Sequence, residues 1–173
     1  MSDGVQTIYD ARPKSVGSWS FEIREGDETG EIVAEVTIKG KWDEGEIRVG
    51  GIPFEVDRVG MSRAYRLVFE SQTLAHAKPE GALGLSSTIA VEGALLASGV
   101  EVGDRVRFDL KPKGAFSSDM LFSLDGTEWG QITKEALMFR HFALRFNDAV
   151  PLALQCFCFA LLLARMRRQA RNG

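Results

Sequence analysis

The chain has 173 residues, of which 45% are hydrophobic and 26% charged, and its formal net charge is −3. This length is enough for one ordinary domain with a real core, and the apolar and charged fractions argue against wholesale disorder. A sequence pI of about 5.5 argues against a protein that coats nucleic acid, because a basic surface is missing.

The N-terminal segment shows no targeting signal. It has neither a basic n-region nor an apolar h-region, so we expect no signal peptide and a cytoplasmic, reducing environment. We expect residues 1–18 to form an N-terminal arm and residues 19–171 to form a single domain, because no linker rich in Pro or Ser divides the rest of the chain.

Most of the chain before the C-terminal block consists of short extended segments separated by turn signals. Residues 18–24, for example, alternate between apolar and polar side chains, as in a half-buried strand. The pairs Gly50-Gly51 and Asp125-Gly126 stand between such segments and predict two-residue hairpin turns. The predicted strands are 18–24, 32–38, 46–49, 52–59, 65–70, 73–77, 87–91, 94–97, 106–111, 120–124, 128–133 and 142–146. About twelve short strands at this spacing are typical of an antiparallel sandwich or barrel.

Nearly all the continuous hydrophobicity lies in one block, residues 149–164, in which Gln155 is the only polar side chain. Asn147 and Asp148 can cap a helix or favour its positive end, and Pro151 suits a first turn. Since Ala and Leu are strong helix formers, the block predicts a helix that is apolar on every side.

This helix, over about residues 149–169, must be surrounded either by protein or by lipid. Its apolar part would extend about 24 Å, less than the roughly 30 Å hydrocarbon core of a bilayer, which favours a buried helix over a tail anchor. A closed antiparallel β-barrel of about twelve strands around a hydrophobic C-terminal α-helix would bury both the helix and one face of every strand. The expected fold class is therefore mostly β (α+β), with an interior too full for a ligand cavity.

This combination resembles the tubby-like architecture, which tubby C-terminal domains share with phospholipid scramblases and the plant LURP-one-related proteins. The residues that carry the resemblance are the hairpin 21–32, the segment 129–132 and the ending 150–168. The resemblance implies a cytosolic domain that binds lipid head groups, proteins or both, without an established catalytic centre. Tubby domains recognise phosphoinositides through clustered Lys and Arg. No motif in this chain identifies which of its own residues correspond to those Lys and Arg positions. Neither the calcium-binding segment nor the palmitoylated cysteine cluster of scramblases is recognisable.

Motifs for catalysis or cofactor binding are not recognisable in the chain: it has no GxGxxG after a strand, no P-loop and no GxSxG elbow. Cys156 and Cys158 would point about 200° apart on a helix, so they cannot hold one metal from one face. His141 has no partner that the sequence can name as a catalytic group. We therefore expect no catalytic residue, no metal and no cofactor.

Two groups of arginines are candidates for contact with anionic lipid head groups. The candidates are Arg165, Arg167, Arg168 and Arg171 at the helix end, and Arg58, Arg63 and Arg66 on consecutive strands. The alternatives are that the first group only complements the helix dipole and that the second is dispersed surface charge. The neighbouring carboxylates Asp43 and Glu44 stand in a turn-like stretch, where we expect them to be solvated.

The leading functional hypothesis is a non-enzymatic, tubby-like binding or regulatory module, cytoplasmic or peripheral to the membrane. Its expected partner is an anionic phospholipid or a protein, and not nucleic acid. Two alternatives remain at this point: a tail-anchored membrane protein with a cytosolic β domain, and an enzyme with an unrecognised site.

Overall fold

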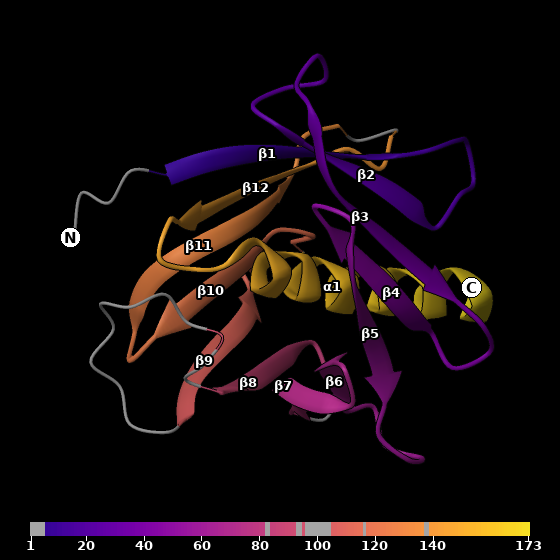
Figure 1. Ribbon diagram of the computed structural model, residues 1–173. Coiled ribbons are helices and arrows are strands. Elements are labelled where there is room, and N and C mark those ends of the chain that lie inside the picture. Colours follow the sequence, from indigo (N-terminus) through magenta and orange to yellow (C-terminus); the bar gives the residue numbers. More distant parts are fainter. Residues whose placement is uncertain (1–5, 82–83, 93–94, 96–104, 116, 137–138) are drawn as a thin grey trace.

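Twelve antiparallel strands and one helix make up the part of the chain that the computed structural model describes, residues 6–81, 84–92, 95, 105–115, 117–136 and 139–173 (Figure 1). The strands are β1 (Gln6–Pro13), β2 (Ser20–Glu25), β3 (Ile32–Lys39), β4 (Glu44–Val49), β5 (Ile52–Arg58), β6 (Tyr65–Phe69), β7 (Gln72–Glu80), β8 (Ser86–Glu92), β9 (Arg105–Pro112), β10 (Met120–Leu124), β11 (Thr127–Lys134) and β12 (Phe142–Asn147). Each strand pairs with the next along the chain, and β1 also pairs with β12, which closes the barrel. The predicted fold class is confirmed.

Two hairpin turns lie where the sequence predicts them. Gly50 and Gly51 have φ angles of 55° and 83°, and Asp125 and Gly126 have φ angles of 49° and 79°. Positive φ at both central residues is typical of a type I′ turn, whose twist matches that of the flanking strands. These turns connect β4 to β5 and β10 to β11.

The prediction of an N-terminal arm over residues 1–18 is wrong for β1. Gln6–Pro13 pairs with β12 on one side and with β2 on the other, so this segment is the strand that closes the barrel. Ala11 is its only buried hydrophobic residue. Tyr9 also packs against the core, but the neighbouring Ile8 is 42% exposed, so the segment lacks the apolar alternation that marks the other strands. The strand predicted at 94–97 falls, except for residue 95, outside the described residues.

The helix α1 (Leu152–Asn172) runs through the ring of strands, as Figure 1 shows. Its N-terminal half is buried on every side by the barrel; the buried residues are Ala153, Leu154, Gln155, Cys156, Phe157, Cys158, Phe159, Ala160, Leu162, Leu163 and Ala164. The Phe159 ring meets the rings of Phe21 on β2 and Phe142 on β12, each at a centroid distance of 5.2 Å. The apolar block thus forms the centre of the core, as the burial hypothesis predicts.

Within the described part of the chain, no helix is both long and apolar enough to cross a membrane. The apolar side chains of α1 that an anchor would offer to lipid are the ones that fill the barrel.

The start of α1 differs from the expectation. Pro151 takes the N-cap position with an extended ψ of 145°, and no side chain caps the helix. Asn147 instead accepts a hydrogen bond from the Ala149 backbone N–H through Oδ1, at 2.9 Å. Asp148 accepts hydrogen bonds from the N–H and hydroxyl of Thr7 on β1, at 2.9 and 3.0 Å. Both side chains lie too far before the helix to cap it, and they hold the turn that leads into it.

Candidate functional site

The C-terminal end of α1 emerges at one end of the barrel, which we call the mouth. The β3–β4 turn at Gly40–Asp43, the β5–β6 turn at Val59–Ala64 and the loop before β8 all lie at this end, because consecutive strands alternate in direction. Three turns of the chain therefore surround the arginines that close the helix.

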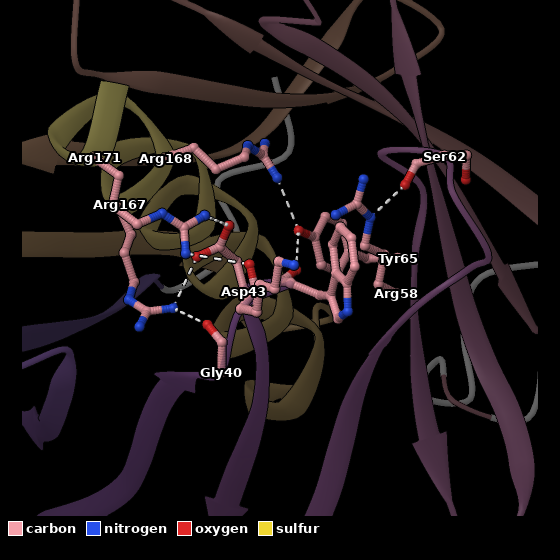
Figure 2. Close-up of polar contacts among 10 residues, drawn as sticks. Gly40, Asp43, Arg58, Ser62, Tyr65, Arg167, Arg168 and Arg171 are labelled. Carbon is pink, nitrogen blue, oxygen red and sulfur yellow. Dashed lines mark hydrogen bonds and ion pairs between the residues drawn. The ribbon is translucent and has the colours of Figure 1, made fainter. Parts of the chain in front are cut away.

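Asp43 joins the β3–β4 turn to the helix end (Figure 2). The residue is only 1% exposed, and its carboxylate oxygens accept hydrogen bonds from Arg167 Nη1 at 2.9 Å and from Arg171 Nη2 at 2.6 Å. The same two guanidinium groups also donate to the backbone carbonyls of Gly40, at 2.6 Å, and Lys41, at 3.2 Å. Asp43 is therefore not the solvated carboxylate that its turn-like sequence suggests, because two cations from a distant segment desolvate and pair it.

Arg168 has a different role at the same end of the helix. Its Nη1 atom donates to the Tyr65 hydroxyl at 2.8 Å, and that hydroxyl donates to the Trp42 carbonyl oxygen at 3.1 Å. Tyr65 is 2% exposed, and burial, ahead of any nearby charge, raises the pKa of its hydroxyl. The hydroxyl therefore stays protonated and bridges the guanidinium to the β3–β4 turn.

Arg165 lies one turn deeper along α1. Its Nη1 atom donates to the Leu85 carbonyl oxygen at 3.3 Å and lies 3.7 Å from the Met120 sulfur. Its Nε atom is buried and has no hydrogen-bond partner among the described residues. Burial, and to a smaller extent the positive charge of Arg168, lowers the pKa of this guanidinium. An unpartnered, desolvated N–H of this kind stabilises an anion that reaches it.

Arg165 and Arg168 share a hollow at the mouth with Arg63 from the β5–β6 turn. Its volume is about 110 Å³, and we call it the arginine pocket; its lining residues are Arg63, Gly84, Leu85, Arg165, Arg168, Gln169 and Asn172. A narrower hollow of about 30 Å³ adjoins it and reaches between the helix and the barrel wall. Since a water molecule occupies about 30 Å³ in the liquid, the arginine pocket has room for a group of a few heavy atoms.

The absence of a carboxylate partner in the part that the structure describes, together with a place in the pocket lining, distinguishes these three arginines from the other candidates. Three of the other four candidates form ion pairs, which are Arg66–Asp57, Arg167–Asp43 and Arg171–Asp43. Arg58 has no carboxylate partner among the described residues either, but it does not line the arginine pocket. Within the described part of the chain, no carboxylate pairs with Arg63, Arg165 or Arg168, and no acidic residue lines the arginine pocket.

The remaining predicted site residues lie beside the pocket or away from it. Arg58 donates from Nε to the Ser62 carbonyl oxygen at 2.6 Å (Figure 2). Its guanidinium also packs over the Trp42 ring, with 4.9 Å between the guanidinium carbon and the ring centroid. Arg66 pairs with Asp57 across β5 and β6 at 3.2 Å, so it belongs to the barrel wall and not to the mouth.

No sequence pattern marks Trp42, Tyr65 or Asp43 as part of the site. The aromatic residues read as ordinary strand or turn positions, and Asp43 pairs with residues more than a hundred positions later in the chain. Local patterns carry no signal for such contacts.

The described residues offer little for metal or nucleophilic chemistry. Among them, no three His, Cys, Asp or Glu residues are grouped so as to hold a metal ion. Burial raises the pKa of both Cys156 and Cys158, which keeps the thiols protonated and poorly reactive. His141 stacks on Phe139 with 5.7 Å between ring centroids. At the mouth, the three arginines of the pocket lining give a local positive charge that suits an anion.

Comparisons with known proteins add no assignment to this geometry. No family model matches the chain, and no curated protein is significantly similar to it.

Proposed function

We propose that this chain is a non-enzymatic, tubby-like binding module whose arginine pocket binds the phosphate of an anionic lipid head group. The closed barrel around a hydrophobic C-terminal helix supports the tubby-like assignment. Because the helix fills the barrel, a ligand has access to the mouth and the outer wall but not to the interior.

The observation that carries the proposal is the convergence of Arg63, Arg165 and Arg168 on one hollow without a carboxylate partner among the described residues. Three like charges in one pocket repel one another, and burial costs Arg165 part of its solvation. A phosphate would relieve both costs, since guanidinium groups bind phosphate oxygens through paired, charge-assisted hydrogen bonds.

Titration calorimetry with inorganic phosphate and with a water-soluble inositol phosphate tests this function. We expect both ligands to bind, and we expect Arg63→Gln and Arg165→Gln each to weaken binding about tenfold, the cost of one charge-assisted hydrogen bond. Arg66→Gln is the matched control, because Arg66 is paired with Asp57 outside the pocket. Absence of binding to either ligand, or equal losses in Arg66→Gln and Arg165→Gln, would overturn the proposal.

A further inference from the structure

Two turns at the mouth expose large apolar side chains next to the arginine pocket. Met61 is 85% exposed and Val59 36% exposed in the β5–β6 turn, and Trp42 is 43% exposed in the β3–β4 turn. Arg58 brings the two turns together, because its guanidinium packs over the Trp42 ring and its Nη2 atom donates to the Met61 carbonyl oxygen at 3.2 Å. We call Lys41, Trp42, Arg58, Val59 and Met61 the rim.

Cations and apolar groups are interleaved along the rim. The Lys41 ammonium lies 5.2 Å from the centroid of the Trp42 ring, on which Arg58 also packs. Arg63, which lines the arginine pocket, follows Met61 by two positions. Trp beside Lys and Arg is the composition that anchors proteins at a bilayer surface, where the ring lies among head groups and the cations meet phosphates.

The rim is held in place before any partner binds. The Trp42 carbonyl oxygen accepts a hydrogen bond from Tyr65, and the residue that follows, Asp43, is clamped by Arg167 and Arg171. On the other turn, the Ser62 hydroxyl donates to the Val59 carbonyl oxygen at 2.6 Å. Groups that are already ordered lose little conformational entropy on binding, so a rigid rim favours docking.

The neighbouring wall carries the opposite charge. A shallow hollow of about 420 Å³ on the outside of β4 and β5 contains the carboxylates of Glu44, Glu46, Glu55 and Asp57, with Lys39 as its only cation among the lining residues. Glu46 and Asp57 pair with Arg48 and Arg66 beside the hollow, which leaves Glu44 and Glu55 as its carboxylates without an ion pair among the described residues. An anionic surface repels the carboxylates of Glu44 and Glu55 and attracts the cations of the rim, which favours an orientation with the mouth toward the surface.

We propose that the rim is a membrane-docking surface for anionic bilayers. Met61 and Trp42 enter the head-group region, Lys41 and Arg58 contact lipid phosphates, and the arginine pocket receives one head group. This inference rests on the proposed function for the pocket, but it adds the bilayer itself as the partner and the rim as the part that enters it.

Vesicle sedimentation measures the docking, with phosphatidylcholine vesicles that contain or lack phosphatidylserine. We expect binding only to the anionic vesicles, weakened about tenfold in Met61→Asp, since the apolar side chain that enters the bilayer is lost. Ile52→Asp is the matched control, because Ile52 is 50% exposed beside the β4–β5 turn, at the opposite end of β4 from the β3–β4 turn. Met61 is exposed, so Met61→Asp should fold, and circular dichroism checks this.

A fluorescent label reports the orientation directly. An environment-sensitive dye on Met61→Cys should shift its emission to the blue when anionic vesicles are added, and the same dye on Ile52→Cys should not. The native Cys156 and Cys158 are buried and should not take up the dye.

The outcomes separate this inference from the proposed function. If Met61→Asp binds vesicles as well as the parent while Arg165→Gln binds phosphate weakly, the docking surface is wrong and the pocket stands. If neither the parent protein nor its variants bind phosphate, while Met61→Asp loses vesicle binding and Ile52→Asp keeps it, the docking surface stands and the pocket is wrong. If the parent ignores vesicles, and Met61→Asp abolishes a dimer seen by analytical ultracentrifugation, the rim is a contact between copies of this chain and the proposal is overturned.

Discussion

Arg171 Nη2 lies 2.6 Å from the carboxylate of Asp43, although 128 positions separate the two residues in the chain. Arg167 reaches the other oxygen of the same carboxylate at 2.9 Å. The last turns of α1 are thus attached to the β3–β4 turn, and the mouth of the barrel is held by one buried charge.

Asp43→Asn tests this attachment, because it keeps the shape of the side chain and removes its charge. We expect a loss of about 2 kcal/mol in the free energy of unfolding, since two hydrogen bonds between charged groups are weakened at a buried site. Urea denaturation measures the loss. Asp57→Asn, which breaks the more exposed pair with Arg66, should cost less than about 1 kcal/mol and serves as the control. Equal losses of unfolding free energy in the two variants would mean that the buried Asp43 pair stabilises the fold no more than the exposed Asp57 pair does.

The enclosed helix leads to a second prediction. Phe159 is fully buried against Phe21 and Phe142, so Phe159→Ala should lower the free energy of unfolding by about 3–5 kcal/mol through the cavity that it leaves. Gln169→Ala, on the exposed part of the same helix, should change it by less than about 0.5 kcal/mol. A loss below about 1 kcal/mol for Phe159→Ala would contradict the placement of the helix in the core.

The buried thiols predict a dependence of stability on pH. Burial raises the pKa of the Cys156 thiol from 9.0 to about 12, and it raises the pKa of Cys158 in the same direction. Unfolding therefore releases protons between about pH 9 and pH 12, so the free energy of unfolding falls as the pH rises through that range. The double variant Cys156→Ala, Cys158→Ala should lose less stability between about pH 8 and about pH 10 than the parent does. Urea denaturation midpoints measured across this pH range test the prediction. Midpoints that fall by the same amount in the parent and in the double variant would contradict the burial of the thiols.

Ionic strength should separate the pocket from the rim. Phosphate binding to three arginines should weaken as sodium chloride rises from about 0.1 M to about 1 M, because the screening length falls from about 10 Å to about 3 Å. On anionic vesicles, the blue shift of a dye attached to Met61→Cys should fall less with salt than phosphate binding does. The reason is that apolar groups inserted in the bilayer are not screened by salt. Calorimetry and fluorescence in the same salt series measure the two effects. Phosphate binding that is insensitive to salt would contradict a charge-based site.

Local patterns predicted much of the fold. Period-two alternation located β3 to within one residue at each end, and a short apolar run located β12 equally well. Gly50-Gly51 predicted its turn because both residues take positive φ. The apolar block predicted a buried helix from its length and uniform hydrophobicity. β1 escaped prediction because only Tyr9 and the small Ala11 face the core from it, while the apolar Ile8 is exposed.

The candidate site was predicted only as a set of residue types. Seven arginines were candidates, but the sequence could not indicate that Arg165 and Arg168 share a hollow with Arg63 while Arg167 and Arg171 pair with Asp43. These groupings depend on which face of α1 meets which turn of the barrel. Such contacts join distant parts of the chain and have no local pattern.

The most direct test of the arginine pocket follows the Nε–H of Arg165, which is buried without a hydrogen-bond partner among the described residues. In a ¹H–¹⁵N NMR titration with inorganic phosphate, we predict that this resonance shifts and saturates while that of Arg66 stays unchanged. The same titration of Arg63→Gln should require higher phosphate concentrations. An Arg165 Nε–H resonance that does not respond to millimolar phosphate, or that shifts no more than the resonance of Arg66, would contradict the proposal.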